Sequence, residues 1–223
     1  MRYFSRRSLI VGLIGVVVTD RLYAVPAGIG ERPVRSLPSD TILRLDEVIK
    51  GINPPTAGEL TTANKVIERS PKAVNPFKVA QYFERLGRGE ENPSGEDWSA
   101  YAREWPDRYN PVIVRFFEAI STVSASGDCT KWCSAFVNWC IKRGREGRPD
   151  ANTLTDYTHD ALAASFQKFG TRTDDPKPGD VAVFKHHVGF FSRPSSHKQK
   201  IWIIGGNQAA PPLEEPTSCP GNM

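Results

Sequence analysis

Cys133 is the residue of this chain best placed to act as a nucleophile. It follows a Gly127-Asp128 turn and lies in the first turn of a helix predicted over residues 130–143, whose apolar residues form one face. Unpaired backbone N–H groups and the helix dipole at such a position favour a thiolate over a thiol. A thiolate attacks acyl carbons, and the same N–H groups can stabilise the oxyanion that forms. We therefore expect acyl-transfer chemistry at Cys133.

A nucleophilic cysteine needs a base, and the chain offers four histidines: His159, His186, His187 and His197. His187 opens an apolar strand that would hold its ring at the end of a sheet, whereas His186 faces the opposite way because strand residues alternate. Asn207 follows the next strand, where its side-chain oxygen could accept a hydrogen bond from the His187 ring. The order Cys133, His187, Asn207 is typical of a papain-like site.

Four strings around these residues together resemble the CHAP domain: Trp132-Cys133-Ser134-Ala135, Pro178-Gly179-Asp180-Val181, His187-Val188-Gly189-Phe190 and Gly205-Gly206-Asn207-Gln208. CHAP domains are cysteine- and histidine-dependent amidohydrolases or peptidases with a papain-like fold, and many of them cut peptidoglycan. The resemblance covers about residues 125–210. It implies that Cys133 is the nucleophile, His187 the base and Asn207 the residue that orients the base. The loop between the strand predicted over 181–184 and His187 consists only of Lys185-His186. The choice between His186 and His187 as the base therefore stays open.

The elements around this site predict an α+β fold. Helices are predicted over residues 41–50, 60–70 and 76–86, from residue 110, and over 160–168, and strands over 181–184, 187–191 and 200–204. With the resemblance, this favours a catalytic helix packed on a small antiparallel sheet and preceded by a helical extension. The expected divisions are a signal peptide (1–27), a linker (28–40), a helical region (41–122), a CHAP-like catalytic domain (123–210) and a Pro-rich tail (211–223).

The first 27 residues have the pattern of an export signal. Three arginines precede an apolar run, residues 9–19, which is too short to span a bilayer as a helix. Residues 5–10 resemble the twin-arginine motif, and the general secretory route is the alternative. Residues 1–24 hold four arginines and one aspartate, so their removal lowers the net charge from +4 to +1. We expect a periplasmic or extracellular protein with no membrane span in its mature form and no nucleic-acid partner.

Four cysteines in an exported protein predict disulfide bonds. If Cys133 is the nucleophile, only one disulfide can form among the others. Cys140 points into the core, so Cys129 and Cys219 are the expected pair. A zinc site at Cys129, Cys133 and Cys140 is not expected, because these spacings lack a second close pair of ligands. No cofactor or metal is expected.

These features predict an exported cysteine hydrolase that cleaves amide or peptide bonds in peptidoglycan, as an amidase or an endopeptidase. One alternative is a cysteine amidohydrolase or toxin that acts on a protein outside the wall or on a small amide. The other is a wall-binding module without catalytic activity. The peptidoglycan substrate follows from the resemblance and the export signal, because a fold alone does not specify a function.

Overall fold

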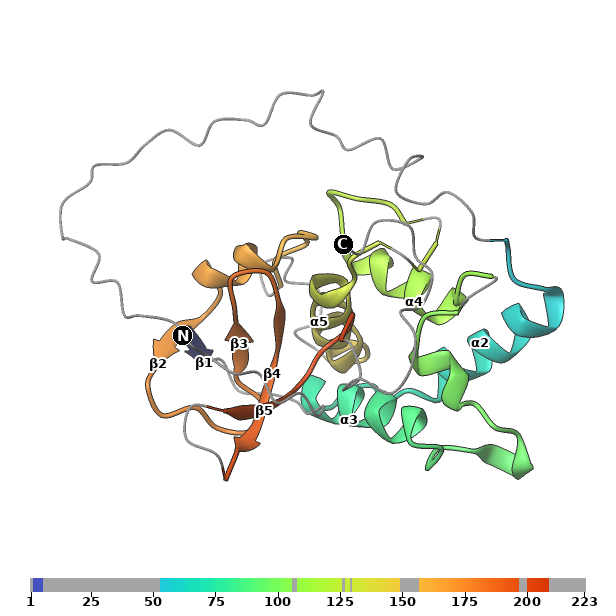
Figure 1. Ribbon diagram of the computed structural model, residues 1–223, viewed down its shortest axis with the longest axis horizontal. Coiled ribbons are helices and arrows are strands. Elements are labelled where there is room, and N and C mark those ends of the chain that lie inside the picture. The colour runs from blue at the N-terminus through green and yellow to red at the C-terminus, as the bar shows by residue number, and fades with distance from the viewer. Residues whose placement is uncertain are drawn as a thin grey trace.

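The computed structural model describes residues 2–5, 53–105, 108–125, 127–128, 130–148, 157–196 and 200–208. Helix α5 (Cys133–Arg145) lies between a β-sheet and the helices α2 (Ala57–Arg69), α3 (Pro76–Gly87) and α4 (Pro111–Phe116), as Figure 1 shows. The predicted α+β class is confirmed. The predicted linker, the helix over 41–50 and the Pro-rich tail lie outside the described residues, as does the predicted signal peptide except for residues 2–5.

Local sequence signals set the starts of three helices. In α2, Thr56 accepts a hydrogen bond from the Glu59 backbone N–H, and the Glu59 carboxylate accepts one from the Thr56 N–H, which forms a capping box. Helices α3 and α4 each begin with an Asn-Pro pair in which the asparagine side chain caps the helix. Short 3-10 helices complete the helical part: η2 (Pro93–Gly95), η3 (Ser99–Ala102), η4 (Phe117–Ala119) and η5 (Ala163–Lys168).

Helix α5 begins at Cys133 and makes contacts along its whole length. Its N-cap is Trp132, whose side chain gives no capping hydrogen bond. Near its other end, the buried Arg143 donates to the Ile67 carbonyl (2.6 Å) and to the Ser70 hydroxyl (2.9 Å). Arg143 also donates to the carbonyls of Glu68 (3.1 Å) and Ser70 (3.2 Å), so it binds several carbonyl groups at the end of α2. A side chain at Gly144 would lie 2.8 Å from the Val74 carbonyl, so glycine allows this close approach.

The sheet has five strands in the order β2-β1-β3-β4-β5, and neighbouring strands are antiparallel. The strands are β1 (Arg2–Ser5), β2 (Thr171–Thr173), β3 (Val181–Val183), β4 (Val188–Pro194) and β5 (Ile201–Ile204). The last three match the predicted strands, whereas β1 and β2 were not predicted. Strands β3 and β4 form a hairpin, in which the Phe184 N–H donates a hydrogen bond to the His187 carbonyl at 2.8 Å. Strand β1 comes from the predicted signal peptide and separates β2 from β3.

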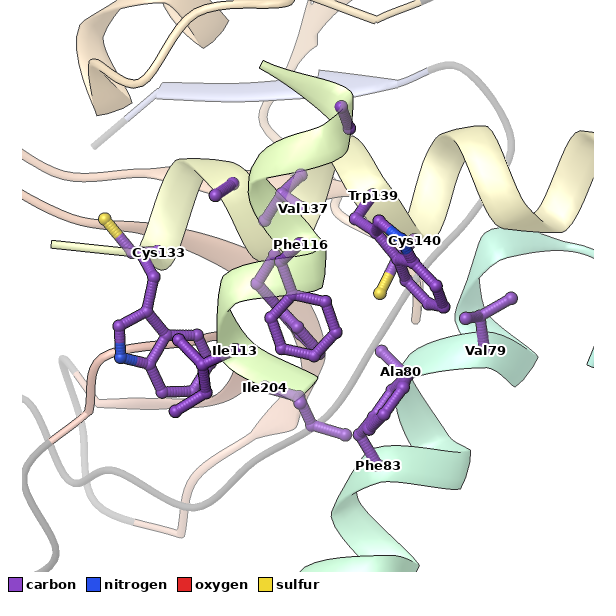
Figure 2. Close-up of a cluster of buried hydrophobic side chains, with 14 of the residues drawn as sticks. Val79, Ala80, Phe83, Ile113, Phe116, Cys133, Val137, Trp139, Cys140 and Ile204 are labelled. Carbon is purple, nitrogen blue, oxygen red and sulfur yellow. The ribbon is translucent and has the colours of Figure 1, made fainter. Parts of the chain in front are cut away.

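One hydrophobic core joins the helices to the sheet. Phe83 of α3 and Phe116 of α4 lie edge to face at 5.2 Å, and both rings pack against Phe136 and Trp139 of α5 (Figure 2). The helices before residue 122 therefore share their core with the elements that carry the predicted site. In the part of the chain that the structure describes, no helix has the length and apolarity that a membrane span requires.

Candidate active site

The predicted nucleophile, Cys133, is the first residue of α5 and only 6% exposed. Its sulfur points away from the aromatic cluster, whereas Cys140 lies within that cluster (Figure 2). Burial raises the pKa of the Cys133 thiol, although hydrogen bonds from the backbone of Val188 and Ser134 act in the opposite direction. The helix N-terminus therefore lowers the pKa of the thiol as expected, but desolvation raises this pKa by more.

Helix α5 packs on β4, and the Val188 backbone at the start of β4 lowers the pKa of the Cys133 thiol; His187 directly precedes Val188. Burial lowers the pKa of His187 to about 4, so the ring is neutral at neutral pH. His186 lies at the tip of the β3–β4 hairpin and is exposed. The hairpin therefore places the partly buried His187 directly before the residue that acts on Cys133, and it leaves His186 at the exposed tip.

The turn after β5 contacts both His187 and Trp132, the residue before Cys133. The Gln208 side-chain nitrogen lies 3.2 Å from Nε2 of His187. The Asn207 side-chain oxygen instead accepts a hydrogen bond from the Trp132 backbone N–H at 3.4 Å. Asn207 has a φ of 53°, a left-handed conformation that asparagine adopts more readily than most residues. The structure thus places Gln208 at the His187 ring and Asn207 at Trp132, the residue before Cys133.

Two glycines allow this turn to come so close. A Cβ atom at Gly205 would lie 3.1 Å from Nε2 of His187 and 3.0 Å from the Gln208 side-chain nitrogen. A Cβ atom at Gly206 would lie 2.5 Å from Cζ3 of Trp132 and closer still to Cε3. Gln208 was not predicted as a site residue. The signal that could have identified it is its position next to Asn207, after a Gly-Gly pair that leaves room for the histidine ring.

Asn138, one turn after Ser134 in α5, holds a loop against the start of this helix. Its side-chain oxygen accepts from the Thr158 N–H (2.8 Å), and its amide donates to the Ser134 carbonyl (3.1 Å). The Ser134 hydroxyl donates to the Asp160 carbonyl. His159 lies in this loop with its ring 3.8 Å from that of Tyr157. The structure therefore places His159 among loop contacts, and His197 lies outside the described residues.

Two of the four cysteines, Cys133 and Cys140, lie in the part of the chain that the structure describes. Cys133 and Cys140 are both free, and no group of three or more metal-binding side chains occurs among the residues that the structure describes. Burial raises the pKa of Cys140 well above its usual value, as expected for an unreactive core thiol. Cys129 and Cys219, the expected disulfide pair, lie outside the described residues.

Comparison with known proteins supports a family for the part of the chain that holds this site. The family model of the CHAP domain matches residues 125–207, which include α5, β3, β4, β5 and the turn after β5. Searches of curated proteins and of solved structures found no match. The matched segment contains each of the predicted site residues Cys133, His187 and Asn207. Residues 125–207 of this chain therefore match the CHAP domain family, as the resemblance of the sequence predicted.

Proposed function

We propose that this protein is an exported cysteine hydrolase that cleaves amide bonds in the peptide part of peptidoglycan. CHAP domains are amidases and peptidases, typically of peptidoglycan, and this supports the class of reaction. The observation that carries the proposal is the junction of α5 and β4, where the Val188 backbone bonds to Cys133 and His187 directly precedes Val188. A helix that starts at Cys133 and packs on a strand that starts directly after His187 supports the papain-like arrangement that the resemblance implies.

The lowered pKa of His187 and the raised pKa of Cys133 favour a neutral imidazole beside a neutral thiol before the reaction. His187 then acts as a general base and removes the thiol proton as the sulfur attacks the carbonyl carbon. The backbone N–H groups at the start of α5 face the developing negative charge on the carbonyl oxygen. The tetrahedral intermediate collapses, the C–N bond breaks, and His187 returns the proton to the leaving amine.

The resulting thioester is hydrolysed by the same groups. Neutral His187 accepts a proton from water as the oxygen attacks the thioester carbonyl carbon. The C–S bond then breaks, the sulfur recovers the proton from His187, and the product leaves as a carboxylic acid that releases its proton to water. Asn207 and Gln208 complete the proposed site, Gln208 through the His187 ring and Asn207 through the Trp132 backbone.

The test is digestion of purified peptidoglycan, with release of new amino groups and mass spectrometry of the soluble fragments. We expect Cys133→Ala to abolish release, because no other group supplies the nucleophile. Cys140→Ala is the matched control, since Cys140 is a buried thiol on the same helix, and it should retain activity. Circular dichroism would establish that both variants fold. Unchanged digestion by Cys133→Ala would remove the mechanism.

Two results would favour other functions. A wild-type protein that leaves peptidoglycan intact, yet has a Cys133 that iodoacetamide alkylates faster than Cys140, would indicate an amidohydrolase with another substrate. Equal binding of the wild-type protein and Cys133→Ala to the wall, without digestion by either, would indicate a binding module. Fractionation of cells that express the full chain would test the proposed export.

A further inference from the structure

Trp132, the residue directly before the nucleophile, is held from three sides. Its ring stacks on Phe116 of α4 with centroids 5.8 Å apart and an interplanar angle of 27°. Gly206 lies against another side of the ring, where a Cβ atom would overlap it. The ring Nε1–H donates to the Glu104 carboxylate at 2.9 Å. The side chain is 7% exposed, so these contacts leave the indole little room to move.

Glu104 is itself placed by a second carboxylate. Asp128 is fully buried and accepts hydrogen bonds from the backbone N–H groups of Trp105 (3.0 Å) and Asn110 (2.8 Å). Trp105 directly follows Glu104, so Asp128 holds the backbone on which Glu104 stands. The Glu104 carboxylate thus reaches Trp132 from the helical part of the chain, outside the residues that match the CHAP family.

The position of Trp132 determines the position of the nucleophile. Trp132 is the N-cap of α5, and its carbonyl accepts the first helical hydrogen bond, from the Phe136 N–H at 2.9 Å. Because the Trp132 side chain makes no capping hydrogen bond, the contacts of its ring hold the first turn of α5 in place. A shift of the indole would rotate the backbone that carries the Cys133 sulfur and N–H. Displacements of about 1 Å in a catalytic group can cost roughly 100-fold in rate.

We propose that Glu104 is a positioning residue for catalysis, which acts through the indole of Trp132 to hold Cys133 in register with His187. The helical region before the CHAP domain would then be part of the catalytic apparatus. The rate measurements below rest on the proposed peptidoglycan hydrolysis, whereas the alkylation measurements do not.

The test compares kcat and KM of four variants on a soluble peptidoglycan fragment. Glu104→Leu keeps the approximate size of the side chain but removes the acceptor, and it should lower kcat about 10- to 100-fold with KM nearly unchanged. Glu104→Gln retains an acceptor oxygen and should stay within about threefold of the wild type. Trp132→Phe should match Glu104→Leu. The double variant Glu104→Leu/Trp132→Phe should be no slower than either single variant, because both remove the same interaction.

The chain offers a matched control for a merely structural role. Glu96 accepts a hydrogen bond from Nε1 of Trp98 at 2.9 Å, and it pairs with Lys65 of α2 rather than with the start of α5. Glu96→Leu therefore removes a similar tryptophan–glutamate bond and should leave kcat unchanged. A loss in Glu96→Leu equal to that in Glu104→Leu would overturn the proposal, as would additive losses in the double variant or wild-type kcat in Glu104→Leu.

Alkylation by iodoacetamide, mapped by mass spectrometry, provides a second readout that needs no substrate. Glu104→Leu should slow alkylation of Cys133 about tenfold while Cys140 stays protected, because Cys133 loses its alignment with His187 but the core stays closed. Exposure of Cys140 would indicate general loosening and would contradict the positioning role. If the wild type does not digest peptidoglycan but Glu104→Leu still slows alkylation of Cys133, the proposed function falls and the positioning role stands.

Discussion

Replacing Gly206 by alanine tests how tightly the turn after β5 packs against the start of α5. The new Cβ atom would lie 2.5 Å from Cζ3 of Trp132 and 2.9 Å from Cβ of Phe136, where ordinary contacts begin near 3.4 Å. The indole must therefore move by about 1 Å, which disturbs its contacts with Phe116 and Glu104. Overpacking of this kind costs about 1–3 kcal/mol, and loss of the Trp132–Glu104 hydrogen bond adds about 1 kcal/mol.

We expect Gly206→Ala to lower the free energy of unfolding by about 3 kcal/mol, which for a chain of this size lowers the Tm by about 6–12 °C. Gly58→Ala is a control that should raise the free energy of unfolding rather than lower it. Gly58 lies in the first turn of α2, and a Cβ atom there meets its nearest neighbour at 4.0 Å. Alanine should therefore stabilise the protein by about 0.5 kcal/mol through the entropy of the unfolded chain.

Urea denaturation and thermal unfolding, both followed by circular dichroism, measure these differences. Gly206 is not among the glycines with positive φ, so the expected loss comes from steric overlap and not from backbone strain. A Gly206→Ala variant whose Tm lies within 1 °C of the wild type would show that the indole is free to move, and it would refute the account of Trp132 given above.

Three further predictions concern other parts of the molecule. Arg143→Lys should lower the free energy of unfolding by about 3 kcal/mol in urea denaturation, because lysine cannot replace the donors that reach Ile67 and Ser70 at the end of α2. The kcat/KM profile should lose activity as the pH falls through about 4, since a base must be neutral and burial lowers the pKa of His187 to that value from 6.5. Deletion of residues 1–27 removes β1 and should speed amide hydrogen exchange in β3, which pairs with β1 over Arg2–Phe4.

Each of these three predictions would be contradicted by a specific result. A wild-type urea midpoint in Arg143→Lys would mean that the end of α2 does not depend on the guanidinium. An acid limb near pH 6.5 would mean that His187 is not desolvated in the free enzyme. Unchanged exchange in β3 after deletion would mean that pairing with β1 does not stabilise β3.

Local sequence determined the features whose hydrogen bonds close within a few residues. The Asn-Pro pairs at 75–76 and 110–111 specify helix starts, because the asparagine oxygen and the missing proline N–H both act within the first turn. The two-residue loop before His187 likewise specifies a hairpin. The position of Cys133 at the start of a helix and that of His187 directly before a strand were therefore predictable, and so was the α+β class.

Tertiary structure decided the features that depend on what each residue packs against. Strands β1 and β2 were not predicted, because a short strand is stable only when distant residues pair with it. The helix start alone favoured a thiolate at Cys133, but burial against the rest of the fold raises the pKa of its thiol. The left-handed turn at Asn207 directs that side chain to Trp132 and leaves Gln208 at His187. Sequence order predicts which residues can react, whereas desolvation and side-chain direction arise only when separate segments meet.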